Sequence, residues 1–311
     1  MPETKGGAAK WLKIDLLTPP EFVDGLTNFL TEIGADGVVQ EVTEPSLTNE
    51  FVEPTTKESL AAYLPCDVRL DGRITSLQAY IGSLAELFPA SEKVSYNQEV
   101  LSDPDWGEQW KKYFKPLRVS KNIVIKPTWE RYTPLGHDIV IDIDPGMAFG
   151  TGQHPSTRMC IEAIEDILLK DRTVEHWRVL DVGTGTGILG ISCAKLGAQR
   201  VVCVDIDKKA TEIARENVMI NQVEDRVEIL NRDVTTIHEQ FDLIVANLTA
   251  RLLMKLRDHL VSILANGGRM VISGIIDQNR EDVEEHFISD AFSIRHTITE
   301  KEWICLVLKK R

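Results

Sequence analysis

The chain has 311 residues, of which 43% are apolar and 27% are charged, and its formal net charge is -13. This composition is typical of a globular protein with one large domain and a smaller one, and it excludes a disordered or fibrous chain. The acidic balance excludes general binding to nucleic-acid backbones, so we expect no direct contact with nucleic acid. Two interpretations of the charge stay open, a basic partner or simple maintenance of solubility.

No part of the sequence indicates a membrane, secretory or metal-binding protein. No apolar run reaches the length of a membrane span, and the N-terminal segment lacks the long apolar core of a secretory signal. We therefore expect a cytoplasmic protein, and we expect it to be a monomer. Neither the histidines nor the cysteines have metal-ligand spacing, and the cysteines are expected to be reduced and buried: Cys66, Cys160, Cys193, Cys203 and Cys305.

Residues 1–95 contain two rounds of strand and helix signals. In chain order, the expected strands are 11–17, 36–42, 60–70 and 93–100, and the expected helices are 21–34 and 74–88. Leu12, Ile14 and Leu16 alternate at the period of a strand, and Gly34 is a candidate C-cap of the first helix. Two such rounds in so short a stretch predict a small ferredoxin-like α+β domain.

Residues 96–118 are the expected linker helix between two domains. Asp103 is placed to cap this short helix, with Pro104 at its first position. Four aromatic residues then share one side of the helix: Trp106, Trp110, Tyr113 and Phe114. Such a stripe usually packs against a neighbouring domain, and direct contact with a substrate is the less favoured alternative.

Residues 119–311 alternate apolar strands with amphipathic helices, which predicts a Rossmann-like doubly wound parallel sheet. The strand segments are RVLDVG, RVVCVDID, VEILNRDV, FDLIVANL and RMVISGI. The last segment, FSIRHTITEKEWICLVL, predicts two strands around a turn. One antiparallel strand should therefore close an otherwise parallel sheet.

A glycine-rich loop, DVGTGTG, places Gly183, Gly185 and Gly187 between a strand and a helix. Glycines there allow positive φ and let a ligand approach the backbone, beside the free amides of the helix start. We expect an adenosine-like ligand, and the alternative is a tight turn without a ligand. Gly185, Gly187 and Gly190 also fit the dinucleotide pattern GxGxxG, so the loop alone does not distinguish a nicotinamide cofactor from S-adenosylmethionine.

Acidic residues near this loop favour S-adenosylmethionine. Asp181 precedes the loop at the strand end, where a carboxylate suits the ammonium group of a methionine and where dinucleotide loops usually lack an acid. Asp205 ends the next strand and can take both ribose hydroxyls of either ligand, and we expect the adjacent Ile206 to contact the cofactor as well. Asp233 can accept a hydrogen bond from an adenine amine. Together with the closing hairpin, Asp181 predicts a class I methyltransferase sheet.

Asn247 ends the strand FDLIVANL, where a side chain faces the crevice in which open sheets bind ligands. Its amide oxygen can accept a hydrogen bond from an incoming amine and aim the nitrogen lone pair at a sulfonium methyl. Asn247 is therefore the predicted catalytic residue and a predicted cofactor contact, and the alternative is a cap for a turn or the next helix. No side chain is clearly placed as a base, so we expect water to take the proton.

A second loop, DPGMAFGTGQHPST at residues 144–157, precedes another helix and is expected to close over the cofactor. Phe149 can cover the apolar part of the ligand, and the glycines after it supply the bends. Thr157, in the first helical turn, can offer its hydroxyl to the methionine carboxylate. For His154 we favour satisfaction of backbone groups over a role near the amine.

The chain resembles a known family in the motifs DPGMAFGTGQHPST, DVGTGTG, VDID, VANL and EKEW, whose order and spacing are those of the bacterial methyltransferases of large-subunit ribosomal protein eleven (PrmA type). This resemblance covers roughly residues 100–311. It implies methylation of the α-amine and lysine side chains of that basic protein, which the N-terminal domain grips. It also implies cofactor contacts from Thr157, Gly183, Asp205 and Asn247. Gln153, where relatives often carry Thr, and NLTA in place of NILA are modest departures.

Other functions stay open at this point. The same fold can methylate another protein or a small molecule, because the first hundred residues contain no motif specific enough to identify a substrate. A nicotinamide-dependent oxidoreductase is permitted by the GxGxxG overlap and disfavoured by Asp181 and the hairpin. A non-catalytic binding module, such as a ribosome-assembly factor, is disfavoured by the intact Asn247 and the intact 144–157 loop.

Overall fold

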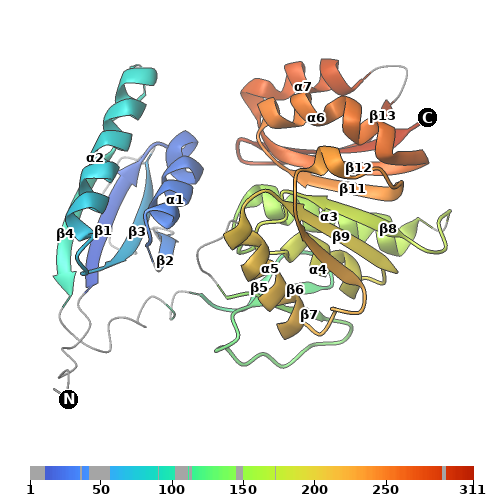
Figure 1. Ribbon diagram of the computed structural model, residues 1–311, viewed down its shortest axis with the longest axis horizontal. Helices are drawn as coiled ribbons and strands as arrows, with labels where there is room; N and C mark the ends of the chain where they lie inside the picture. The colour runs from blue at the N-terminus through green and yellow to red at the C-terminus, as the bar shows by residue number, and fades with distance from the viewer. Residues whose placement is uncertain are drawn as a thin grey trace, which may run out of the picture. The chain divides into compact units, whose positions relative to one another are not determined.

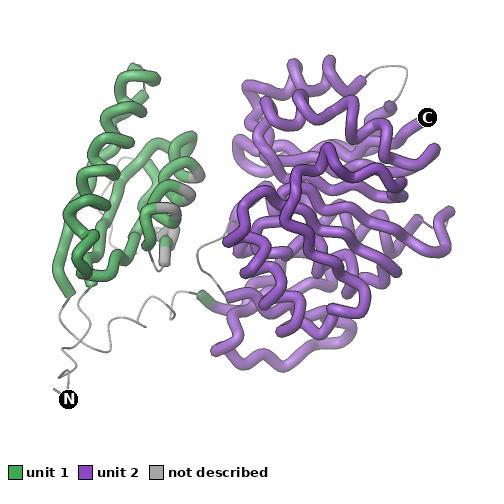
Figure 2. Tube along the Cα trace, in the orientation of Figure 1, with its two compact units in different colours: residues 1–114, 145–147 green, residues 115–144, 148–311 purple. Residues whose placement is uncertain are grey.

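The structure is a computed structural model, and it describes residues 11–35, 37–41, 57–89, 91–101, 111, 114–144, 150–171, 173–288 and 292–311. The chain divides into two compact units, which are residues 1–114 with 145–147 (unit 1) and residues 115–144 with 148–311 (unit 2) (Figure 2). Unit 1 contains one sheet and unit 2 contains two, and each unit has its own apolar core.

Unit 1 is an antiparallel sheet that packs against two helices (Figure 1). Its elements are β1 (Trp11–Thr18), η1 (Pro20–Phe22), α1 (Val23–Glu32), β2 (Gly37–Glu41), β3 (Glu58–Pro65), α2 (Leu70–Leu87) and β4 (Ser95–Leu101). The sheet order β2-β3-β1-β4 is that of a ferredoxin-like domain, so the predicted N-terminal fold is confirmed. Alternation in β1 buries Leu12, Ile14 and Leu16 against Leu26 of α1 and Leu77 of α2.

The last strand of unit 1 extends beyond the domain boundary that we propose from the sequence. Strand β4 pairs with β1 as far as Leu101, so it continues past the boundary proposed at residue 95. The aromatic linker helix falls largely outside the described residues, and its predicted stripe is described only at Phe114, which is buried. Gly34 has φ +95°, and its amide bonds to the Thr31 carbonyl at 2.9 Å, so the predicted helix end is confirmed.

Unit 2 is built around the predicted doubly wound sheet. Its elements from residue 155 onward are α3 (Pro155–Lys170), β8 (Arg178–Val182), α4 (Ile188–Lys195), β9 (Arg200–Asp205), α5 (Lys208–Ile220), β10 (Val227–Asn231), η3 (Val234–Thr236), β11 (Phe241–Asn247), α6 (Ala250–Ile263), β12 (Leu264–Ile276), η4 (Asp277–Asn279), α7 (Arg280–Phe287), β13 (Phe292–Glu300) and β14 (Trp303–Lys310). The strand order is β10-β9-β8-β11-β12-β14-β13. Strands β8 to β12 pair in parallel, and β14 pairs antiparallel with both β12 and β13. The class I methyltransferase fold with its closing hairpin is therefore confirmed.

The sheet of unit 2 has a separate apolar cluster on each face, because its strands are buried on both sides. In β8, Val179 packs on the side of α3 and α4, with Ile161 and Ile188. The next residue, Leu180, belongs to the cluster formed with α6 and α7. Asp181 has the parity of Val179 in this strand, so its carboxylate lies on the α4 side of the sheet.

A small sheet in unit 2 was not anticipated from the sequence. Strands β5 (Leu117–Arg118), β6 (Ile123–Lys126) and β7 (Ile139–Asp142) form it in the order β5-β6-β7. Ile123, Ile125 and Ile141 are buried in the cluster that contains α3 and α4. Strands this short give little periodic signal, which explains why residues 119–144 received no elements in the sequence analysis.

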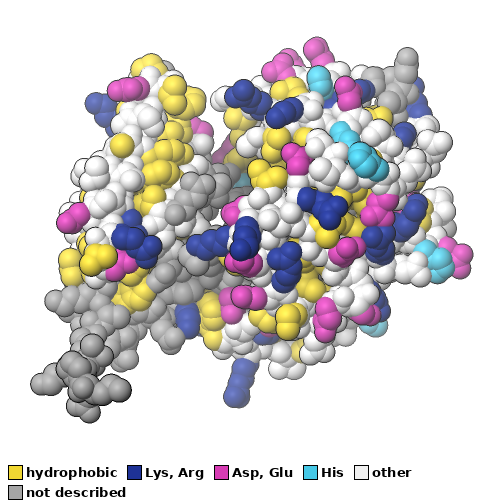
Figure 3. All heavy atoms as spheres, viewed as in Figure 1, with side chains coloured by type: hydrophobic (Ala, Val, Ile, Leu, Met, Phe, Trp, Pro, Cys, Tyr) yellow, Lys and Arg dark blue, Asp and Glu magenta, His cyan; other side chains and the backbone are white. Residues whose placement is uncertain are grey.

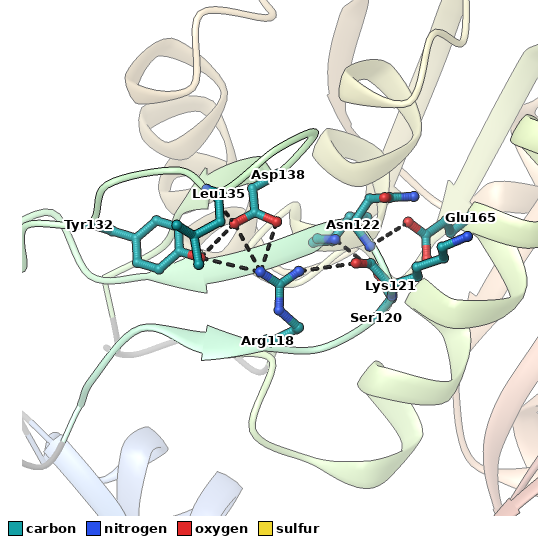
Figure 4. Close-up of polar contacts among 9 residues, drawn as sticks. Arg118, Ser120, Lys121, Asn122, Tyr132, Leu135, Asp138 and Glu165 are labelled. Carbon is teal, nitrogen blue, oxygen red and sulfur yellow. Dashed lines mark hydrogen bonds and ion pairs between the residues drawn. The ribbon is translucent and has the colours of Figure 1, made fainter.

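Arg118 of β5 is fixed by a carboxylate from the β6–β7 connection (Figure 4). Its guanidinium donates to both oxygens of Asp138, at 2.7 and 2.9 Å. The Tyr132 hydroxyl and the Leu135 amide donate to the same carboxylate, at 2.6 and 2.9 Å. These donors, with the tyrosine hydroxyl first, lower the pKa of Asp138 to about 2.

The turn between β5 and β6 is tied to α3 by one buried carboxylate (Figure 4). Glu165 of α3 accepts from the backbone amides of Lys121 and Asn122, at 3.1 and 2.9 Å. Glu165 is only 4% exposed, so these amides satisfy a charge that would otherwise be costly to bury. The small sheet thereby supports the helix whose first turn carries Thr157.

Within the described residues, no helix has the length and apolar character needed to cross a bilayer. All five cysteines are free, four of them buried and Cys66 partly buried. Figure 3 shows Lys and Arg side chains interspersed with Asp and Glu over the visible face of unit 2. The net negative charge is therefore not gathered into a single patch on that face.

Candidate active site

Three neighbouring strands bring predicted site residues to one edge of the large sheet. Strands β9, β8 and β11 are adjacent and parallel, so their carboxyl ends meet at the same edge. Asp205 and Asn247 are the last residues of β9 and β11, and Asp181 is the penultimate residue of β8. This edge is where open α/β sheets bind ligands.

The glycine-rich loop between β8 and α4 has the backbone that its sequence predicts. Gly183, Gly185 and Gly187 have φ of +69°, +55° and +84°. The Gly183 amide donates to the Val204 carbonyl at 2.9 Å, which fixes the loop to β9. A Cβ atom on Gly183 would lie 2.5 Å from Cδ2 of Leu248, so a side chain at this position would displace its neighbour.

Thr186 joins the two glycine-containing loops. Its buried hydroxyl donates to the Gly150 carbonyl at 2.6 Å, and its own carbonyl accepts from Nδ2 of Asn217 in α5 at 2.9 Å. Gly150 and Gly152 have φ of +106° and +82°, so the predicted bends are present. The sequence analysis missed Thr186, because the spacing of the glycines around it carries no signal about the threonine.

Phe149 lies outside the described residues, and its contact with the cofactor stays a prediction. The start of α3 beyond that loop is described. His154 is the N-cap of α3, where Nδ1 accepts from the Ser156 amide at 3.2 Å and Pro155 takes the first helical position. His154 therefore satisfies a backbone amide, the role that the sequence analysis favours for it.

Asp181 is 1% exposed, and only one of its carboxylate oxygens is satisfied. Oδ2 accepts from the Thr184 hydroxyl at 2.6 Å and from the Gly190 amide at 3.1 Å, whereas Oδ1 has no hydrogen-bond partner in the described part of the chain. Burial raises the pKa of Asp181 to about 6, and the charge of Asp205 acts in the same direction. Such an oxygen is costly to bury unless a donor completes it.

Asp205 is half-buried, and a backbone amide already bonds each of its oxygens. Oδ2 accepts from Gly185 and Oδ1 from Asp207, both at 3.0 Å. Each carboxylate oxygen can accept a second bond, so two hydroxyls can still be bound. Ile206 is 78% exposed and offers an apolar surface beside this carboxylate. Asn231 holds the pair in place by donating to both of their carbonyls, at 3.0 and 3.1 Å.

Asp233 has a structural role besides its predicted one. Its Oδ1 caps η3 by accepting from the amide and the hydroxyl of Thr235, at 2.9 and 2.8 Å. The amide bond is the first cause that lowers the pKa of Asp233, so the residue is an anion at neutral pH. Both of these bonds use Oδ1, so Oδ2 is the oxygen that would make the predicted contact with an adenine amine.

Asn247 meets Thr157 across the site. Nδ2 of Asn247 donates to Oγ1 of Thr157 at 3.3 Å, and Thr157 is 1% exposed in the first turn of α3. The N-cap of the next helix, α6, is Thr249, so Asn247 does not cap that helix. With the amide nitrogen directed to Thr157, the amide oxygen is the acceptor that remains for a substrate.

Gly274 supports Asn247 from the neighbouring strand, and the sequence analysis missed it. It has φ +81° and lies where the pairing of β12 with β14 shifts register, between Ile272 and Ile275. A Cβ atom there would lie 2.5 Å from the Leu248 carbonyl oxygen and 3.0 Å from Oδ1 of Asn247. A lone glycine within a strand is a weak sequence signal, although it often marks such a bulge.

The site combines anionic and hydrogen-bonding groups. Among the described residues, no group of three or more His, Cys, Asp or Glu side chains is placed to hold a metal ion. A buried carboxylate, a second carboxylate beside an apolar surface, and an amide oxygen lie along one sheet edge. This set fits a ligand that carries an ammonium group, two hydroxyls and an apolar ring.

Comparisons with known proteins agree in one family. Residues 10–311 match the family described as ribosomal protein L11 methyltransferase (PrmA). The ribosomal protein L11 methyltransferase of Heliobacterium modesticaldum is 38% identical over 318 residues, covering 97% of this chain and 98% of its own. The ribosomal protein L11 methyltransferase of Anoxybacillus flavithermus is 36% identical over 320 residues, which cover 97% of this chain and 100% of that protein. The crystal structure of ribosomal protein L11 methylase from Lactobacillus delbrueckii subsp. bulgaricus is 32% identical, with a TM-score of 0.58, and covers 64% of this chain and 100% of that chain.

Proposed function

We propose a substrate and a role for each site residue of this chain. The chain belongs to the ribosomal protein L11 methyltransferase (PrmA) family of S-adenosylmethionine-dependent protein methyltransferases. This membership confirms the resemblance seen in the motifs and rules out the nicotinamide-dependent oxidoreductase. The proposed reaction moves methyl groups from S-adenosylmethionine to lysine side chains and the N-terminal α-amine of ribosomal protein L11. We place it in the cytoplasm, and we propose that the protein is a monomer.

The residues present fit S-adenosylmethionine. The unpaired Oδ1 of buried Asp181 suits the ammonium of the methionine part. Gly183 has φ +69°, a bend that brings the loop backbone beside the ligand. S-adenosylmethionine supplies an electrophilic methyl group on a sulfonium. The proposed cofactor contacts are Phe149, Thr157, Asp181, Gly183, Gly185, Gly187, Asp205, Ile206, Asp233 and Asn247.

The roles of these residues follow from their chemistry. Thr157 offers its hydroxyl to the methionine carboxylate beside the amides of the α3 start, and Asp181 takes the ammonium. Asp205 binds the ribose hydroxyls, Ile206 covers one face of the adenine, and Asp233 accepts from its amine. Each role uses an atom that the described contacts leave able to accept, to donate or to cover the ligand.

Asn247 is the proposed catalytic residue, and its contact with Thr157 is the observation that supports this role most strongly. The bond from Nδ2 to Thr157 leaves Oδ1 to accept from the substrate amine, which directs the nitrogen lone pair. Deprotonating a lysine with a pKa near 10.4 costs roughly 4 to 5 kcal/mol at pH 7, and an α-amine near 8 costs much less. Water takes the proton, and the protein contributes orientation and the exclusion of bulk solvent from the methyl group.

Unit 1 is proposed to recognise the basic ribosomal protein. The net charge of -13 supports attraction to such a substrate, since opposite charges raise the encounter rate. The same acidic balance supports the absence of direct binding to nucleic acid. Methylation of another protein or a small molecule is the second candidate, because the reaction groups of unit 2 do not depend on the identity of the amine.

One experiment tests reaction and substrate together. The purified protein is incubated with methyl-labelled S-adenosylmethionine and unmethylated ribosomal proteins, and mass spectrometry locates the label. Label on amines of ribosomal protein L11 is the expected result. Label on a different protein would overturn the proposed substrate and keep the proposed reaction. If the protein binds the cofactor but transfers no label in the presence of L11, both the proposed substrate and the proposed catalytic role of Asn247 would be overturned.

A further inference from the structure

We infer that the turn of the C-terminal hairpin positions Thr157 by holding the start of α3 through two contacts, Arg158 with Glu300 and His154 with Trp303. We call these four residues the clasp. The inference depends on the proposed function, because Thr157 is assigned there to the cofactor. It gives a role to the EKEW segment, which contains Glu300 and Trp303 and which the cofactor site leaves unused.

The first contact is an ion pair that also reaches the loop before α3. Arg158 contacts both carboxylate oxygens of Glu300 through Nη2 and Nε, the latter at 3.4 Å. Its Nη1 donates to the carbonyl of Gln153. One guanidinium therefore joins the hairpin turn, the loop and the helix start, and its fixed planar shape restricts all three.

The second contact joins the same two segments through their rings. The imidazole of His154 and the indole of Trp303 meet edge to face, with centroids 4.7 Å apart and planes at 78°. His154 is also the N-cap of α3, so the ring contact acts on the residue that sets the first turn. Because Thr157 lies between His154 and Arg158, both ends of its turn are held.

The turn itself is anchored to the sheet. Glu300 pairs with Trp303 across the hairpin, with Lys301 at φ +52° between them, and the Asp277 amide donates to the Glu302 carbonyl at 2.8 Å. The clasp therefore relates the start of α3 to the sheet that carries Asn247. Loss of the clasp should let the Thr157 hydroxyl shift away from the cofactor.

The test combines cofactor affinity with hydrogen exchange. For Glu300→Ala, we expect the Kd for S-adenosylmethionine, measured by calorimetry, to rise about fivefold while kcat at saturating cofactor changes less than twofold. The backbone amides of Thr157 and Arg158, which both bond to the His154 carbonyl at 3.1 Å, should exchange faster in the cofactor-free variant. If Glu300 acts through Arg158, the double variant Arg158→Ala/Glu300→Ala should bind no more weakly than Arg158→Ala alone.

Two further variants separate positioning from general stability. Glu300→Gln keeps the shape and one acceptor, so it should fall between wild type and Glu300→Ala. Asp242→Asn weakens the paired contact of Asp242 with Arg178, where Nε lies 3.1 Å from the carboxylate, at the other ends of β8 and β11. It should leave cofactor Kd and exchange in α3 unchanged.

Unchanged exchange and unchanged Kd in Glu300→Ala would overturn the clasp, as would an equal loss of affinity in Asp242→Asn. The exchange measurement needs no cofactor. Failure of the wild-type protein to bind S-adenosylmethionine would therefore count against the proposed site, while faster exchange in Glu300→Ala would still support the clasp.

Discussion

Nδ2 of Asn247 lies 3.3 Å from Oγ1 of Thr157 and donates to it, although the two residues are 90 positions apart in the chain. The contact joins the end of β11 to the first turn of α3. It links the residue proposed to orient the substrate amine with the residue proposed to bind the methionine carboxylate. A change at either position should therefore separate turnover from cofactor binding in a characteristic way.

Asn247→Ala should lower kcat on the order of 100-fold and change the Kd for S-adenosylmethionine by only a few fold. The variant removes the acceptor that aims the amine, and misorientation of a reacting group costs about this much. Single-turnover kinetics and calorimetry measure the two quantities. Thr157→Val is the matched comparison, in which affinity should fall more than kcat. Equal losses of affinity and turnover in Asn247→Ala would make Asn247 mainly a binding residue.

Asp181→Asn should stabilise the cofactor-free protein at pH 7.5. Because burial raises the pKa of Asp181 from 3.8 to about 6, the stability of the folded state falls as pH rises through this interval, and at neutral pH ionisation costs about 3 kcal/mol. Asn keeps an acceptor for Thr184 and Gly190, but its Nδ2 is left without a partner, which costs part of this gain. The free energy of unfolding should therefore rise by roughly 2 kcal/mol in the variant. Thermal unfolding should show a Tm higher by a few degrees.

The gain in stability should disappear at pH 4.5, where Asp181 of the folded wild-type protein is already protonated. Without this pH dependence, the change would arise from packing and not from charge. The same variant should bind S-adenosylmethionine at least tenfold more weakly, because the ammonium loses its anion. Stabilisation together with undiminished affinity would show that Asp181 does not contact the cofactor.

Cofactor affinity should depend on pH with a midpoint near 6. The ammonium of the cofactor favours the ionised form of Asp181, whose pKa is about 6. Below pH 6 the carboxyl must therefore lose a proton before the cofactor binds. As the pH falls, the Kd should rise by a factor that approaches ten for each pH unit. Calorimetry between pH 5 and pH 7.5 measures this slope. Asp181→Asn should give a flat profile across that range, and an equally steep profile in the variant would assign the titration to another group.

Strong periodicity and motifs that encode backbone shape made most of the fold predictable. The alternation of β1, the helix end at Gly34 and the closing hairpin follow from local rules that the packing of each unit does not override. The small sheet of β5, β6 and β7 was missed, because its strands are short and Arg118 is held by residues from a long connection.

The candidate site divides in the same way. Asp181, Asp205 and Asn247 lie at or next to the carboxyl ends of their strands, so their shared edge follows from the predicted parallel sheet. The satisfied and unsatisfied oxygens of Asp181 and the link from Thr186 to Gly150 depend on side-chain packing between distant segments. No sequence period encodes such contacts, so only the structure shows which atoms remain for a ligand.

Gly274→Ala should lower both stability and kcat, whereas Gly267→Ala should lower stability alone. Both glycines lie in β12 with positive φ, +81° and +74°, so an alanine costs roughly 1–2 kcal/mol of backbone strain at either position. A Cβ atom at Gly267 meets nothing within 4 Å, but one at Gly274 would overlap the Leu248 carbonyl and approach Oδ1 of Asn247 to 3.0 Å. Relief of that overlap must move the Asn247 amide, so kcat should fall about tenfold or more, with a further stability loss of about 1–3 kcal/mol. Thermal unfolding and kcat at saturating substrates measure both effects, and equal kcat in the two variants would limit Gly274 to a backbone role.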